Sequence, residues 1–148
     1  MDPTITSREI FEKIKQEHDS LREKVRRIHD VLAGPEIAAE EMTRLLREFH
    51  NALRVHFSNE ESDGFFEEVT THAPRLAGRA DQLCVEHEQL RHKAEELCRF
   101  AETGRPSIAW WRELSSRCHE FSKQLMHHES QENKLLQQTH NEDIGESD

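Results

Sequence analysis

Residues 17–24, EHDSLREK, recur almost unchanged as EHEQLRHK at residues 86–93. About forty residues after each copy stands a histidine followed four residues later by a glutamate, first His56 with Glu60 and then His128 with Glu132. On an α-helix, residues four apart lie on the same face. The same half-site, a histidine followed by a His-x-x-x-Glu pair, therefore occurs twice in the sequence. Together the copies supply four histidines and two glutamates, which is the ligand inventory of a two-metal site.

The composition favours a single helical domain. The chain has 148 residues, which is enough for one compact core. Charged residues make up 34% of the chain and apolar residues another 34%, while only 5 glycines and 4 prolines are present. This balance is typical of long amphipathic helices, whereas a β-sheet protein needs more turns and more β-branched residues.

The charge and the cysteines exclude several classes of protein. A formal charge of −10 disfavours binding to nucleic acid or to an anionic membrane surface, because the electrostatic force has the wrong sign. No apolar run has the length of a membrane span, and the N-terminus lacks a signal-peptide pattern. Cys84, Cys98 and Cys118 show no CxxC spacing and are expected to be small buried hydrophobes in a reducing compartment. We therefore predict a soluble cytoplasmic protein.

Capping and stop signals divide the chain into four helical segments. A capping box at residues 6–9 begins the first, and a Gly-Pro pair at residues 34–35 ends it. The second runs from about residue 36 towards 71 and is loosened at residues 62–64, and the third runs from about 75 to Gly104. Ser107 can cap the fourth, which extends to about residue 138. Residues 1–138 thus form one domain, and residues 139–148 are predicted to be a disordered acidic tail.

An apolar stripe follows one face of each segment, with spacings of three and four residues. Six strongly polar residues interrupt these stripes, and they belong to the two half-sites. They are His18, His56, Glu60, His87, His128 and Glu132. Burying an ionisable group without a partner costs several kcal/mol, so this set requires a cation for compensation.

The spacing around the turns places the six residues at one height. His18 precedes Gly34 by 16 residues and His56 follows it by 22; His87 precedes Gly104 by 17 and His128 follows it by 24. With a rise of about 1.5 Å per residue, the two residues on either side of each turn differ in axial position by two helical turns or less. Helix tilt and loop residues can absorb this difference. We predict an all-α, up-and-down antiparallel four-helix bundle in which the six side chains converge.

The types of ligand in this set narrow the choice of metal. Imidazole and carboxylate ligands suit iron, with manganese and zinc as alternatives, and no sulfur ligand belongs to the set. Glu60 and Glu132 can bridge two metals while the histidines bind terminally. Six protein ligands leave coordination positions open for an oxo or hydroxo bridge and for a small exogenous ligand.

The arrangement resembles the hemerythrin-like family of four-helix bundles with a non-haem di-iron centre. His18 and His87 match the first- and third-helix ligands, and the pairs that begin at His56 and His128 match those of the second and fourth helices. The resemblance covers residues 8–138. Oxygen-carrying hemerythrins have a second histidine four residues after the third-helix ligand, where this chain has Arg91, and an aspartate five after the fourth-helix histidine. The four-His, two-Glu set is closer to the Repair of Iron Centers proteins.

The resemblance implies that two irons bind dioxygen, nitric oxide or peroxide, for carriage, sensing or stress response. An alternative is an enzyme that reduces peroxide or nitric oxide, or an iron donor that repairs iron–sulfur centres. Reduction would require a redox partner, which the sequence does not identify. A third alternative is a bundle held together by structural zinc, against which the open coordination positions argue.

Several neighbouring residues have competing interpretations. His127 is the alternative to His128 as a ligand, and we expect the other histidines to lie on the surface, with His50 and His119 at most near the bundle edge. Arg22 and Arg91 are expected to be solvated flanking charges rather than partners of the bridging glutamates. Four leucines, one turn from the ligands, are predicted to keep the pocket dry. They are Leu21, Leu53, Leu90 and Leu125.

Overall fold

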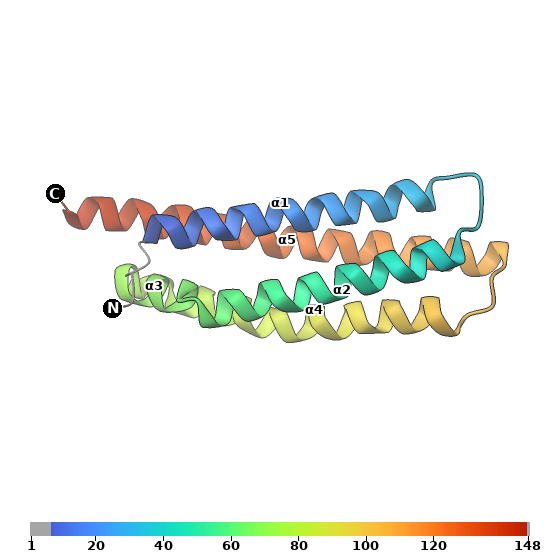
Figure 1. Ribbon diagram of the computed structural model, residues 1–148. Helices are drawn as coiled ribbons and strands as arrows, with labels where there is room; N and C mark the ends of the chain where they lie inside the picture. The colour runs from blue at the N-terminus through green and yellow to red at the C-terminus, as the bar shows by residue number, and fades with distance from the viewer. Residues whose placement is uncertain (1–6, 148) are drawn as a thin grey trace, which may run out of the picture.

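The computed structural model describes residues 7–147 of the chain, and the side chains of residues 8–142. Four long helices lie alongside one another, and a short helix and a 3-10 turn connect the second to the third (Figure 1). The elements are α1 (Ser7–Leu32), α2 (Ala39–Ser62), α3 (Phe65–His72), η1 (Pro74–Leu76), α4 (Ala77–Thr103) and α5 (Ile108–Ser147). Residues 7–147 contain no β-strand, so the predicted all-helical bundle is confirmed. Thr6 of the predicted capping box lies outside the described residues.

The long helices form a ring around a common interior. Helix α1 contacts α2 and α5, and α4 contacts the same two helices, so α1 lies diagonally opposite α4. In Figure 1, α1 runs towards one end of the bundle, α2 returns, α4 runs out again and α5 returns. The short loops after α1 and α4 lie together at that end. Every long helix can therefore present one face to the same interior space.

Two apolar cores fill this interior. One is built mainly from the halves of the long helices nearest the two loops, and the other from the opposite end, where α3 packs against α4 and α5. On α1, Ile14 belongs to the second core and Leu21 to the first; on α4, Leu83 and Leu90 divide in the same way. A layer of polar residues lies between the two cores.

The predicted second segment is interrupted where the sequence loosens. Helix α2 ends at Ser62, and Gly64 adopts a φ of 93° before α3 begins at Phe65. Glycine enters this left-handed region without the steric cost that a Cβ imposes. The predicted third segment begins as the 3-10 turn at Pro74 and becomes α-helical from Ala77.

Helix α5 is longer than the sequence predicts. It continues to Ser147, although we expected it to end near residue 138 and be followed by a disordered acidic tail over residues 139–148. Leu135 and Leu136 are buried in the core beside α3, and Thr139 is buried next to them. The Gln138 side chain accepts a hydrogen bond from Arg79 on α4 at 2.6 Å. These contacts anchor α5 as far as Thr139.

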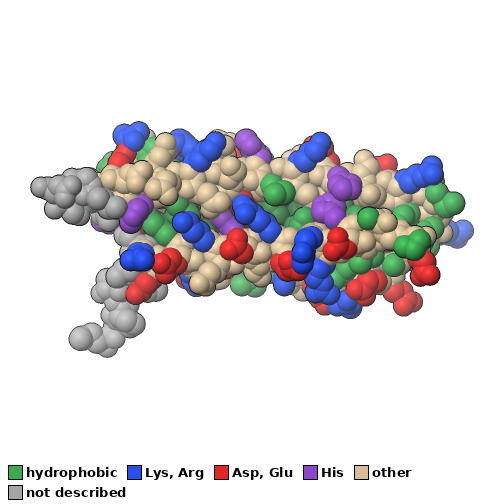
Figure 2. Space-filling model, turned by 90° about the horizontal axis from the view of Figure 1, so that it is seen from above, with side chains coloured by type: hydrophobic (Ala, Val, Ile, Leu, Met, Phe, Trp, Pro, Cys, Tyr) green, Lys and Arg blue, Asp and Glu red, His purple; other side chains and the backbone are tan. Residues whose placement is uncertain are grey.

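The start of α5 and the outer surface follow the sequence closely. The Trp110 backbone N–H donates to Ser107 Oγ at 3.1 Å, which confirms the predicted cap. On the face seen in Figure 2, acidic and basic side chains are interspersed. Among the described residues, no helix combines the length and apolar character that a membrane span requires.

Candidate metal centre

The structure brings all six predicted site residues together in the polar layer. Helix α1 contributes His18 and α4 contributes His87. Helices α2 and α5 contribute the two His-x-x-x-Glu pairs. Each of the six side chains is at most 3% exposed. The interior of the bundle therefore encloses four imidazoles and two carboxylates.

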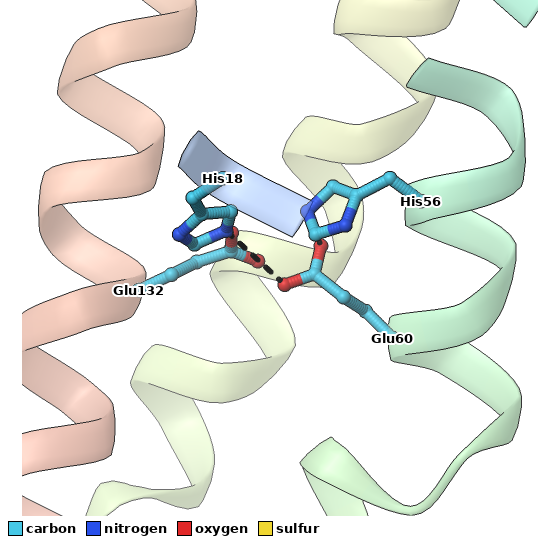
Figure 3. A group of neighbouring side chains, drawn as sticks. All are labelled: His18, His56, Glu60 and Glu132. Carbon is cyan, nitrogen blue, oxygen red and sulfur yellow. Dashed lines mark hydrogen bonds and ion pairs between the residues drawn. The ribbon is translucent and has the colours of Figure 1, made fainter. Parts of the chain in front are cut away.

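In one half of the layer, His18 and His56 face the two glutamates. His18 Nε2 lies 3.1 Å from Glu132 Oε1 and 3.8 Å from Glu60 Oε2. His56 Nε2 lies 3.0 Å from Glu60 Oε1. Figure 3 shows these four side chains converging from three helices, with both carboxylates between the rings.

In the other half, His87 and His128 face the same glutamates. His87 Nε2 lies 3.3 Å from Glu60 Oε1 and 3.2 Å from Glu132 Oε2. His128 Nε2 lies 3.2 Å from Glu132 Oε2. All four histidines thus direct the same ring nitrogen, Nε2, at the carboxylates.

Two groups of four donors result, and they share both glutamates. The first group joins His18 and His56 to Glu60 and Glu132, the second joins His87 and His128 to the same pair, and the donor atoms of each lie within 4.8 Å of one another. Each group could hold a metal ion.

The buried donor atoms of this layer suit bound cations. Both carboxylate oxygens of Glu60, and Nε2 of His56 and of His128, are buried and make no hydrogen bond of good geometry among the described residues; their close neighbours are the ion-pair partners given above. A buried polar atom without a partner costs about 1–3 kcal/mol, and more when it is charged. Metal ions bound between the two pairs of histidines would satisfy these atoms.

Without metal, protons hold the cluster together. Burial lowers the pKa of His18, but the carboxylates of Glu132 and Glu60 outweigh burial and raise it to about 10. The same opposing causes raise the pKa of His87 to about 9. Burial raises the pKa of Glu132, yet its histidine neighbours hold that pKa well below its usual range. Metal binding would displace the protons from the ring nitrogens.

A second set of carboxylates orients the outer ring nitrogens. Glu17 lies 3.2 Å from His56 Nδ1, and Glu86 lies 2.8 Å from His128 Nδ1. Such contacts fix the ring and direct the opposite nitrogen at the metal. The sequence pattern did not predict a role for either glutamate. The available signal was the Glu-His dipeptide, which occurs in both copies of the repeat.

His18 and His87 differ in their outer contacts. His18 Nδ1 lies 3.1 Å from Asn133 Oδ1, within hydrogen-bond distance. His87 Nδ1 has no hydrogen-bond partner among the described residues, and its nearest carboxylate, Glu61, lies 3.8 Å away. Glu61 instead pairs with Arg91 at 2.5 Å. The two halves of the site are therefore supported unequally.

Glu129 is a buried acid that sequence analysis missed. It is 1% exposed, one of its oxygens lies 3.4 Å from Arg22 Nε, and the other has no hydrogen-bond partner within the described part of the chain. Burial raises the pKa of this carboxyl. In the other half the corresponding position is Phe57, whose ring stacks on His87 at 4.0 Å. The burial of Glu129 could not be predicted from the sequence, because this residue lies beside His128 and off the apolar stripe.

The structure confirms some of the predictions for the remaining histidines and cysteines and contradicts others. His127 is exposed and His128 is buried, so His128 faces the cluster. His50 was expected on the surface but is buried, with Nδ1 3.5 Å from Glu95. Cys98 and Cys118 are buried as predicted, whereas Cys84 is only half-buried.

The structure also shows the burial of the leucines and the contacts of the arginines next to the layer. The four leucines predicted to exclude water are all buried. Arg22 lies against Glu129, and Arg91 pairs with Glu61 and Glu88. The two arginines therefore contact acids beside the layer.

Comparison with known proteins supports a cation-binding domain. Residues 9–139 match the family described as Hemerythrin HHE cation binding domain. No curated protein and no solved structure matches the chain significantly. The family match spans almost the whole bundle and includes all six residues of the polar layer. The chain belongs to the hemerythrin HHE cation-binding domain family.

Proposed function

We propose that this protein is an up-and-down antiparallel four-helix bundle that holds two irons and binds a small ligand, either dioxygen, nitric oxide or peroxide. In this assignment one iron takes His18 and His56 and the other takes His87 and His128. Glu60 and Glu132 would supply oxygen ligands to both. The observation that carries the proposal is the pair of four-donor groups that share both carboxylates in a buried layer.

The donor chemistry supports iron over a closed structural metal. Each metal would receive two imidazoles and a share of two carboxylates, which leaves coordination positions for a small ligand. If two ferrous ions were bound by these residues, they would supply electrons and open coordination positions for such a ligand. The protein excludes bulk water, because apolar residues of both cores flank the layer along the bundle axis.

The outer contacts define the roles of the protein's own groups. Glu17 and Glu86 hold the rings of His56 and His128, so that Nε2 of each points inward. The Phe57 ring covers one face of His87. These groups would keep the ligand set in place when a small molecule arrives or leaves.

Metal analysis combined with an absorption spectrum tests the proposal. Protein expressed with iron should contain two irons per chain and show near-ultraviolet charge-transfer bands in air. Reversible bleaching on deoxygenation, without loss of iron, would support ligand carriage. Turnover with a reductant would instead assign an enzyme, and ready loss of iron to a chelator would assign an iron donor. One zinc per chain, or no metal, would refute the di-iron assignment.

A further inference from the structure

A further group of metal-binding side chains lies on the outer side of His87. It consists of Glu61 near the end of α2, Cys84 on α4, and His87 itself three residues later on the same helix. One ligand atom from each, namely a carboxylate oxygen, the cysteine sulfur and a ring nitrogen, all lie within 4.8 Å of one another. The two four-donor groups of the polar layer include neither Glu61 nor Cys84, so this cluster differs from the layer in two of its three residues.

The outer nitrogen of His87 is not used by the polar layer. His87 Nε2 faces the layer, where it lies 3.2 Å from Glu132, whereas Nδ1 is buried and makes no hydrogen bond among the described residues. The whole residue is 0% exposed, and Glu61 Oε1 lies 3.8 Å from Nδ1. A buried polar atom without a hydrogen bond costs about 1–3 kcal/mol. A ligand bound on this side of the ring would remove that cost.

Glu61 is held with one oxygen on the side of His87. Its Oε2 accepts a hydrogen bond from Arg91 at 2.5 Å, while Oε1 is the atom that faces the ring. Arg91 also pairs with Glu88 at 3.1 Å, so two acids balance its positive charge. Arg91 therefore orients the carboxylate and leaves its second oxygen available to a cation.

The charges around Cys84 favour a cation. Burial and the charge of Glu61 raise the pKa of the Cys84 thiol. Arg91 opposes this rise in pKa, and Asp81 and Glu60 add to it. A negative field of this kind attracts cations, and a metal ion that binds the sulfur displaces the thiol proton.

The internal repeat has no equivalent of this cluster in its other half. Around His18, the positions that correspond to Cys84 and Glu61 are occupied by Lys15 and Asn133. Lys15 is exposed, and Asn133 Oδ1 lies 3.1 Å from His18 Nδ1, within hydrogen-bond distance. One half thus satisfies the outer ring nitrogen with an amide. The other half places a sulfur and a carboxylate there instead.

We propose that Glu61, Cys84 and His87 form a separate site for one divalent metal ion of the Zn²⁺ class. Thiolate, imidazole and carboxylate are all zinc ligands, and at bond lengths of about 2.0–2.3 Å the donors of a tetrahedral site lie about 3.3–3.8 Å apart. Glu61 is exposed and Cys84 is half-buried, so small movements of these two side chains close the site around the fixed ring. Three protein ligands leave the fourth position to water.

This site does not require iron in the polar layer. A metal at Nδ1 displaces the proton from that nitrogen and leaves a neutral ring, whose Nε2 keeps its proton towards the carboxylates. The outer site can therefore be measured on the metal-free protein.

Titration of the reduced, metal-free protein with Co²⁺ tests the site. Co²⁺ accepts the ligands of Zn²⁺, and a thiolate bound to it gives a near-ultraviolet charge-transfer band. The six residues of the polar layer contain no sulfur, so they cannot produce this band. The wild-type protein should develop it. Zn²⁺ added afterwards should remove the band, whereas excess Mg²⁺, which prefers oxygen ligands, should leave it unchanged.

Two variants and a matched control assign the band to this cluster. Cys84→Ser should abolish the band, because it removes the sulfur and keeps a side chain of similar size. Glu61→Gln should weaken Co²⁺ binding, followed by the same band, by about tenfold or more. The control is Glu88→Gln, which removes the charge of the other acid paired with Arg91 and should leave the affinity unchanged.

Absence of the band in the wild-type protein, or its persistence in Cys84→Ser, would overturn the proposal. Equal affinities of the Glu61→Gln and Glu88→Gln proteins, or loss of the band to Mg²⁺, would also overturn it. A protein that takes up two irons but gives no thiolate band lacks this site and keeps the proposed function. A protein that gives the thiolate band but holds no iron has this site and lacks the proposed function.

Discussion

Glu86 Oε1 lies 2.8 Å from Nδ1 of His128, on the neighbouring helix. Glu86 also directly precedes His87, so one Glu-His dipeptide supplies a proposed ligand to the centre and orients another. Glu17 has the same relationship to His56 at 3.2 Å. The repeat in the sequence thus encodes a repeated pair of contacts across helix boundaries.

We expect Glu86→Ala to weaken metal binding by about 10- to 100-fold, because His128 loses the acceptor that fixes its ring. Chelator competition on the metal-loaded protein measures the change in affinity. Glu88→Ala is the matched control, since Glu88 is highly exposed and contacts only Arg91 among the described residues. Equal affinities for the two variants would contradict the role of Glu86.

Replacing Glu132 with alanine should prevent assembly of the metal pair. Its carboxylate faces His18, His87 and His128, so both four-donor groups lose an oxygen ligand. The expected metal content falls from two per chain to one or none. A Glu132→Ala protein with two metals and an unchanged spectrum would show that this carboxylate does not bridge.

The two adjacent histidines on α5 provide an internal comparison. His128→Ala should reduce metal content, whereas His127→Ala should leave it unchanged because that side chain is exposed. Metal content per chain and thermal unfolding are measured for both variants. Comparable metal loss from both would mean that the choice of ligand is wrong.

The metal-free protein should lose stability as the pH rises. The pKa of His18 is raised from 6.5 to about 10, and that of His87 to about 9. A raised folded-state pKa contributes stability that is present below pH 6.5 and is lost as the pH rises through about 9 to 10.

Urea unfolding at pH 6, 8 and 10 measures this loss. The unfolding free energy of the metal-free protein should fall by several kcal/mol across the range. The metal-loaded protein should lack this fall, because a metal replaces the proton on Nε2 of each ring. A metal-free protein whose stability is constant up to pH 10 would contradict the proton-bridged cluster.

Two glycine substitutions should have opposite effects on stability. A Cβ at Gly104 would overlap the indole ring of Trp110, so Gly104→Ala should destabilise the fold by about 1–3 kcal/mol. At Gly78, the second residue of α4, a Cβ would meet no atom within 4 Å. Gly78→Ala should therefore stabilise the protein by about 0.5 kcal/mol or less, because alanine has the higher helix propensity and this position lies in the first turn. Thermal or urea unfolding of both variants checks the signs.

Sequence periodicity was sufficient to predict the helices and the six residues of the polar layer. Alternating spacings of three and four residues identify the face of each helix that must be buried, and the histidines and glutamates are the polar exceptions on those faces. His128 could be distinguished from the adjacent His127 by the same phase, since neighbouring residues point about 100° apart on a helix. Burial of one and exposure of the other agree with this choice.

The outer contacts depended on the tertiary structure. Glu86 reaches His128, Arg22 reaches Glu129 and Lys13 reaches Asp63, each pair joining two helices. Periodicity gives the direction of a side chain around its own helix axis, but not the axial shift and rotation of the neighbouring helix. A contact at 3 Å depends on both, so packing had to decide it.

The sequence indicated the break after α2 but not the full extent of α5. Gly64 indicated a loosened helix, because glycine adopts the left-handed backbone found there without steric cost. The continuation of α5 to Ser147 had no such local signal. The sequence by itself determined which residues are buried together, since burial follows helix periodicity. Tertiary packing decided which partners they meet, since these depend on how two helices are placed against each other.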